Sequence, residues 1–204
     1  MHTLYKDFVL FFSVIDPIGT IPVFLYCTRF LSKSEKTRVA NKAILISALI
    51  LFFFIVFGQI VLEALSIPLS TFQITGGLVL FIFAMTMIFG ESKPESEVSN
   101  AKEKSLKDLA VFPLAVPSIA SPGAMMASVL LTDNYRFNIQ EQALTTLMLI
   151  AVLVITYFLL RFSFKIQKII GEMGANVLSR ISGLLLASIA VDSILVGVQK
   201  FFGI

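Results

Sequence analysis

The sequence lacks tryptophan and holds only one cysteine and one histidine among its 204 residues. The single Cys27 cannot form an intrachain disulfide, and the single His2 excludes a histidine-cluster metal site or a histidine-based triad within the chain. The H-E-x-x-H, G-x-S-x-G and P-loop motifs are also missing from the sequence. We therefore do not expect an enzyme, a bound metal or a resident cofactor.

Charge is scarce as well, because 14% of the residues are charged and 57% are hydrophobic, with a mean hydropathy of +0.91. This balance excludes an ordinary soluble domain and indicates a membrane protein. Each of six stretches with no charge or a single acid is near the ~20 residues that span a bilayer. They cover residues 8–28, 43–62, 64–90, 109–132, 143–160 and 181–199. The first is interpreted as a spanning helix rather than a signal peptide, since it lacks a basic leader and a cleavage site.

The basic residues are distributed unevenly between the predicted loops. Thirteen of the sixteen fall in the loops between spans 1 and 2, 3 and 4, and 5 and 6, against Lys6, Arg136 and Lys200 elsewhere. By the positive-inside rule, those three loops are cytoplasmic and both termini lie outside. The net charge of +3 then reflects topology, and nucleic acid is not an expected partner.

Two of the hydrophobic stretches are interrupted by similar motifs. Asp16-Pro17-Ile18-Gly19 breaks the first and Ser121-Pro122-Gly123-Ala124 breaks the fourth. In each motif a residue type that is favoured at helix N-caps is followed directly by a proline, which is favoured at the first helical position. Each motif therefore predicts a half-helix that begins within the membrane, one at Pro17 and one at Pro122. The residues before the other prolines, Ile21, Phe112 and Val116, are also expected to leave helical geometry.

The two halves of the chain resemble each other. Gln73–Val79 aligns with Arg180–Leu186 at an offset of 107, and the two breaks stand 105 apart. These matches predict an all-α membrane protein of six helices, built as a 3+3 inverted repeat with broken helices 1 and 4. Residues 1–108 form the first repeat with a polar cytoplasmic linker from Glu91 to Asp108, and residues 109–204 form the second.

Paired breaks at corresponding places are typical of midplane sites in secondary transporters. Asp16 is a functional candidate because a carboxylate at mid-membrane costs on the order of 3 kcal/mol. It is suited to bind an ammonium group or cation, to carry a coupling proton, or to cap the half-helix. The half-helix N-termini favour a carboxylate, so a small zwitterion fits both groups. The predicted substrate site comprises Asp16, Pro17, Gly19, Thr20, Ser121, Pro122, Gly123, Ala124 and Asp192, the second intramembrane acid.

The motifs Asp16–Phe24, Ile74–Gly77, Phe112–Pro117 and Ala120–Ala124, in this order, resemble the MarC-related family of six-helix inner-membrane proteins. The family belongs to the broad LysE-like group of exporters, and some members are described as transporters of glycine and alanine. The resemblance implies a transporter of small neutral amino acids in the inner membrane, with export as one direction. Separately from the resemblance, a proton or a sodium ion is a candidate coupling ion. The expected partners are a small-molecule substrate and the lipid bilayer, and a homo-oligomer is compatible with them.

Two alternatives stay open at this point. An ion or metal carrier would use Asp16 and Asp192 as cation ligands. A structural or partner-binding membrane protein would need the breaks for assembly and would show no flux.

Overall fold

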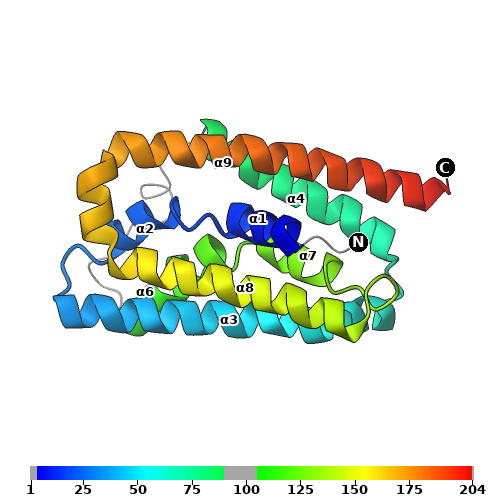
Figure 1. The fold of residues 1–204 in the computed structure, drawn as a ribbon, viewed down its shortest axis with the longest axis horizontal. Coiled ribbons are helices and arrows are strands. Elements are labelled where there is room, and N and C mark those ends of the chain that lie inside the picture. Colours follow the sequence, from blue (N-terminus) through cyan, green and yellow to red (C-terminus); the bar gives the residue numbers. More distant parts are fainter. Residues whose placement is uncertain (1–3, 90–104, 204) are drawn as a thin grey trace.

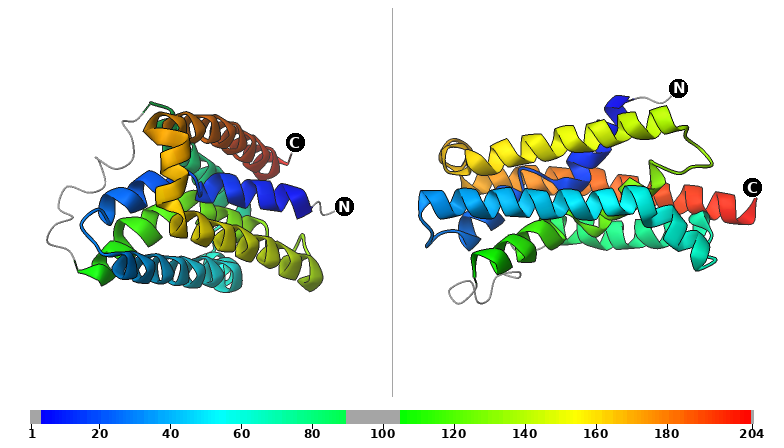
Figure 2. Two further views of the ribbon diagram at one scale, coloured as in Figure 1. Left: turned by 60° about the vertical axis from the view of Figure 1, so that its left-hand side comes forward. Right: turned by 90° about the horizontal axis from the view of Figure 1, so that it is seen from below.

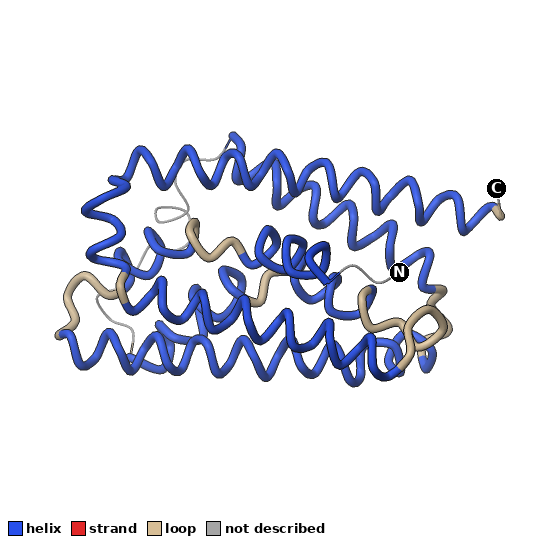
Figure 3. Tube along the Cα trace, viewed as in Figure 1, coloured by secondary structure: helices blue, strands red, loops and turns tan. Residues whose placement is uncertain are grey.

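A computed structural model describes residues 4–89 and 105–203 of the chain, and these residues form helices joined by short connections (Figures 1 and 3). The helices are α1 (Leu4–Ile15), α2 (Thr20–Cys27), α3 (Lys33–Ala64), α4 (Leu69–Phe89), α6 (Leu106–Leu109), η1 (Ala110–Ile119), α7 (Pro122–Leu130), α8 (Ile139–Arg161) and α9 (Ser163–Phe202). The predicted all-α membrane fold is therefore confirmed.

Six membrane spans follow from these helices. Leu4–Cys27, α3, α4, α8 and Arg180–Phe202 are each long and apolar enough to cross a bilayer, and Leu106–Ile119 with Pro122–Leu130 makes a sixth that bends by 57°. They match the six stretches predicted from hydropathy. The first and fourth spans are the broken ones, as the proline motifs indicate.

The spans run along one axis, so the connections gather at the two ends of the bundle (Figures 1 and 2). One end carries the connections 28–32 and 162 and the beginning of α6, together with most of the basic residues. The described residues nearest both chain termini lie at the other end, with the connections 65–68 and 131–138. A chain that crosses the bundle six times has both termini at the same end, as is seen here.

Local capping determines where several helices begin. Ser32 with Glu35, Ser105 with Asp108, and Asn138 with Glu141 each form a capping box at the starts of α3, α6 and α8. Ser105–Asp108 belongs to the segment expected to be a polar linker, and there it starts the fourth span instead. The remainder of that segment, up to residue 104, lies outside the described residues.

Helices α4 and α9 pack against each other in antiparallel directions (Figure 1). A Cβ at Gly77 would lie 3.0 Å from the carbonyl oxygen of Ala190 and 2.7 Å from Ile194 Cγ1. A Cβ at Gly183 would lie 3.2 Å from the carbonyl oxygen of Ala84 and 3.0 Å from Ile88 Cγ1. Two close approaches of the same kind therefore hold this pair together.

The two glycine contacts are reciprocal in sequence. One offset of 106 residues relates the contacts, since it takes Gly77 to Gly183, Ala84 to Ala190 and Ile88 to Ile194. This value lies between the offsets of 105 and 107 found for the sequence motifs. An antiparallel helix pair with exchanged contacts is what a two-fold axis in the membrane plane generates. The contact pattern is consistent with the predicted inverted repeat.

Two expectations about helix boundaries are wrong. The region between spans 5 and 6 is helical, because α9 begins at Ser163 and turns at Gly171, whose φ of 70° suits glycine. Ile21 stays helical inside α2, since Pro22 occupies the first turn of that helix, where no backbone N–H is needed.

Candidate site at the two helix breaks

The first break is a tight turn built around Asp16. This residue has a φ of 47°, a left-handed conformation that aspartate tolerates better than most residues. Its Oδ1 accepts a hydrogen bond from the backbone N–H of Gly19 at 3.0 Å, and its carbonyl oxygen accepts one from the Thr20 hydroxyl at 3.0 Å. The second half-helix consequently begins at Thr20 rather than at Pro17, which lies within the turn.

The second break follows the prediction closely. Ser121 is the N-cap of α7 with a ψ of 157°, and its Oγ accepts a hydrogen bond from the Ala124 N–H at 3.1 Å. Pro122 takes the first helical position. Upstream, Phe112 and Val116 have extended backbones ahead of Pro113 and Pro117, as predicted, so the span is irregular before it breaks.

A side-chain hydrogen bond joins the two breaks. The Ser121 hydroxyl donates to the carbonyl oxygen of Val14 at 2.8 Å, across 107 positions of sequence. Val14 lies in the last turn of α1, where carbonyl groups have no partner within the helix. The end of α1 and the start of α7 are thus linked through one hydroxyl.

The breaks lie in the middle of the bundle, and the new half-helices leave them in opposite directions, α2 toward the basic end and α7 toward the other end (Figure 1). Asp16 is 3% exposed, and Thr20, Ser121 and Ala124 are 0% exposed. Most of the irregular backbone at the breaks is covered by protein, as is required of backbone that would otherwise face lipid, while Ile18 is partly exposed and Pro122 is exposed. In this conformation a ligand reaches the Asp16 carboxylate and the Ala124 N–H only if the covering helices separate.

The backbone donors at the start of α2 are already used. Gly19 N–H bonds to Asp16 Oδ1, Thr20 N–H to the Asp16 carbonyl at 3.0 Å, and Ile21 N–H to the Ile18 carbonyl at 3.1 Å. Pro22 has no N–H to offer. The expectation that both half-helix N-termini present donors to an anion therefore does not hold for α2 in this conformation.

Three predicted site residues do not converge with the others. Pro122 is exposed on the outside of its helix turn. Gly123 packs against Leu80 of α4 and Val14 of α1, so its missing side chain serves helix packing. Asp192 is exposed on α9, because the side of α9 that meets α4 carries Gly183, Ala190 and Ile194. Asp192 was expected to be the second acid of the site, and its exposure sets it apart from the breaks. Asp16, Pro17, Gly19, Thr20, Ser121 and Ala124 are buried at the breaks.

The sequence reasoning missed a buried acid in the first span. Asp7 is 4% exposed, and its Oδ2 accepts a hydrogen bond from the Thr145 hydroxyl of α8 at 2.7 Å. The first apolar stretch begins at residue 8, which left Asp7 outside the predicted span. The available signal was its place one turn inside a continuous apolar helix.

These features define a class of protein: an all-helical membrane protein with two broken spans whose breaks meet at mid-bundle. The chain belongs to the MarC family, because the family model described as "MarC family integral membrane protein" matches residues 1–202.

Curated relatives agree with this assignment over nearly their full length. A UPF0056 membrane protein of Methanocaldococcus jannaschii is 32% identical over 191 residues, covering 92% of each chain. UPF0056 membrane protein YvbG of Bacillus subtilis is 31% identical over 200 residues, covering 96% of this chain and 93% of the relative. A UPF0056 membrane protein of Buchnera aphidicola subsp. Baizongia pistaciae is 33% identical over 199 residues, covering 94% and 90%. No solved structure matches the chain.

Proposed function

We propose that this protein is a secondary transporter of small neutral amino acids of the glycine and alanine type. The observation that carries the proposal is the meeting of two broken spans at mid-bundle, with the buried Asp16 carboxylate at one break and the start of α7 at the other. Discontinuous helices at corresponding places in two repeats are the usual frame of a substrate site in secondary transporters.

In the described conformation, the protein's own groups take up the positions that substrate groups need. Asp16 Oδ1 bonds to the Gly19 N–H, and Ser121 Oγ bonds to the Ala124 N–H. The ammonium group of a substrate would compete for Asp16, and its carboxylate would take the place of the Ser121 oxygen at the positive end of α7. A substrate with a small side chain fits best, because Val14, Ser121 and Ala124 are 0% exposed and leave little room at this point.

Alternating access then amounts to separating the covering helices first toward one end of the bundle and then toward the other. The basic end faces the cytoplasm of the inner membrane in this proposal, since that orientation obeys the positive-inside rule. A coupling proton or sodium ion would bind at or near Asp16.

The test is uptake of radiolabelled glycine or alanine by proteoliposomes containing the purified protein, with and without a pH or sodium gradient. Asp16→Asn is expected to abolish gradient-driven uptake while the protein stays folded, because the neutral amide cannot pair with an ammonium group or carry a proton. Asp192→Asn is the matched control and is expected to retain uptake, since Asp192 is exposed on α9.

The outcomes separate the proposal from its alternatives. Absence of flux from well-folded protein contradicts transport and favours a structural role. Gradient-driven ion flux without amino acid uptake favours an ion carrier, which would have to use Asp16 without Asp192. Normal coupled uptake by the Asp16→Asn variant would reduce Asp16 to a residue that only stabilises the turn.

A further inference from the structure

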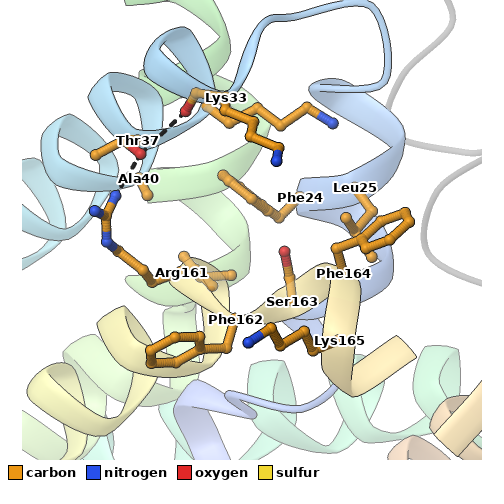
Figure 4. Close-up of a pocket in the computed structure, with 12 residues that line it drawn as sticks. Phe24, Leu25, Lys33, Thr37, Ala40, Arg161, Phe162, Ser163, Phe164 and Lys165 are labelled. Atoms are coloured by element: carbon orange, nitrogen blue, oxygen red, sulfur yellow. Dashed lines mark hydrogen bonds between the residues drawn. The ribbon is translucent and has the colours of Figure 1, made fainter. Parts of the chain in front are cut away.

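A cavity of about 530 Å³ opens at the basic end of the bundle, away from the two breaks (Figure 4). It lies where α2 ends, where α3 begins, and where α8 turns into α9. Two stretches distant in sequence, residues 24–40 and 160–165, therefore line one hollow, at the level where the predicted apolar spans give way to charged loops.

The polar lining of this cavity is strongly basic. Lys33 and Lys36 come from α3, Arg161 from the end of α8, and Lys165 from the start of α9, while the described lining residues include no aspartate or glutamate. The nearby Glu35 has its carboxylate bonded to the backbone N–H of Ser32 at 2.8 Å in the capping box of α3. A concave site lined by one sign of charge attracts counter-ions of the opposite sign.

Two hydroxyl groups lie beside these charges, those of Ser163 and Thr37, and the Thr37 hydroxyl already donates to the Lys33 carbonyl at 3.1 Å. The Ser163 side chain is 4% exposed, and its oxygen points into the space between the basic side chains (Figure 4). Thr37 accepts a hydrogen bond from the Arg161 guanidinium, which ties the end of α8 to α3 at the cavity wall. The bond holds the Arg161 guanidinium at the cavity wall, where Arg161 stays exposed to solvent.

The remaining wall is apolar. Phe24 and Ala40 are 2% and 1% exposed, Leu160 is 1% exposed, and all three line the cavity. A basic rim above an apolar wall matches a molecule with an anionic head and a hydrocarbon chain. Basic pockets between membrane helices on the cytoplasmic side are known to bind anionic lipid headgroups.

We propose that this cavity binds a phosphate group, with Arg161, Lys33, Lys36 and Lys165 pairing its oxygens and Ser163 donating a hydrogen bond. Arginine suits this role because its planar fork matches phosphate oxygens in pairs. The phosphate is carried either by an anionic phospholipid, whose acyl chain would lie on the Phe24 side, or by a soluble phosphate compound. This site is independent of the proposed transport function.

General attraction of a basic loop to an anionic membrane does not explain the arrangement. Arg38 and Lys42 lie on the same helix as Lys33 and Lys36 but do not line the cavity. A purely electrostatic surface effect treats the two pairs alike, whereas a built site depends on the lining pair.

The experiment measures binding of a fluorescent phosphatidylglycerol to the full-length protein in detergent micelles, with labelled phosphatidylcholine as the uncharged comparison. The double variant Lys33→Gln, Lys36→Gln is expected to weaken phosphatidylglycerol binding about 30-fold, because each lysine near an anionic group contributes roughly a factor of five. Arg38→Gln with Lys42→Gln is the matched control with the same loss of charge, and it is expected to bind like the unmodified protein. Elution as a single species in size-exclusion chromatography verifies folding of each variant.

Competition identifies the source of the phosphate. Displacement by unlabelled phosphatidylglycerol but not by millimolar inorganic phosphate or glycerol phosphate supports a lipid site, and displacement by the soluble compounds supports a soluble phosphate ligand at the same residues. The proposal is overturned if the Arg38→Gln, Lys42→Gln double variant weakens phosphatidylglycerol binding as much as the Lys33→Gln, Lys36→Gln double variant does. It is also overturned if the protein binds phosphatidylcholine as tightly as phosphatidylglycerol. A second variant, Ser163→Ala, gives an independent check, since it keeps every charge and is expected to weaken binding several-fold.

Discussion

Replacing Ser121 with alanine tests whether the two breaks are held together by one hydroxyl. The change removes the N-cap of α7, a loss that typically costs about 1 kcal/mol. It also leaves the buried Val14 carbonyl without its donor, which costs roughly a further 1–3 kcal/mol. Since Ser121 is 0% exposed, water does not compensate easily. We expect Ser121→Ala to lower the free energy of unfolding by about 2–4 kcal/mol.

The chain contains its own reporter for this measurement. Cys27 is the only cysteine, is 3% exposed, and ends α2, the half-helix that follows the first break. Its reaction with a thiol-specific fluorescent dye during heating or detergent titration follows the unfolding of this region. Circular dichroism at 222 nm, recorded in parallel, reports the whole helical fold.

Ser128→Ala is the matched control. Ser128 is equally buried, but its hydroxyl donates only to the Ala124 carbonyl one turn earlier, at 2.8 Å, in the same helix. That carbonyl is also placed to accept the backbone N–H of residue 128, so the loss is expected to stay below about 1 kcal/mol. If Ser121→Ala is no more destabilising than Ser128→Ala, the link between the breaks does not contribute as argued.

Three further predictions concern packing, the buried acid and orientation. Gly77→Ala and Gly183→Ala are each expected to lower the free energy of unfolding by about 1–3 kcal/mol, because each added Cβ would meet a backbone oxygen of the opposing helix. The two losses are expected to be similar. Unequal losses in the dye assay would contradict the equivalence of the two contacts. Thr145→Val removes a donor to the Asp7 carboxylate and is expected to cost about 1–3 kcal/mol. Thr156→Val, which loses only a bond within its own helix, is expected to cost less. In a Cys27→Ala background, Tyr135→Cys is expected to react with a membrane-impermeant maleimide added to intact cells and Ser34→Cys to stay unlabelled; the reverse pattern would invert the proposed orientation.

Much of this architecture follows from local signals in the sequence. Hydropathy located all six spans because apolar length is a property of each segment alone. Ser121 and Pro122 were identified as a helix start because capping is settled within four residues. The first break was placed three residues too early, since Asp16 turned out to stabilise a turn through Gly19 instead of capping a helix that starts at Pro17.

The pairings between distant helices were not predictable in the same way. The bonds from Ser121 to Val14 and from Thr145 to Asp7 depend on which helix faces join, and hydropathy carries no angular information about nearly uniform apolar helices. Asp192 was misplaced for that reason. Small residues at Gly183, Ala190 and Gly197 recur every seven positions and mark the packed side of α9, and Asp192 lies off that side.

The close approach of α4 and α9 has a consequence for motion in this molecule. Helices that meet through glycine, with backbone oxygens of each facing the other, have few ways to slide or tilt without collision, so this pair is expected to move as one rigid body. Conformational change then falls on the broken spans and on α3 and α8. Spin labels on the outer surfaces of α4 and α9 are expected to keep one separation in every state, and they provide a fixed reference frame against which movement of α2 and α7 is measured.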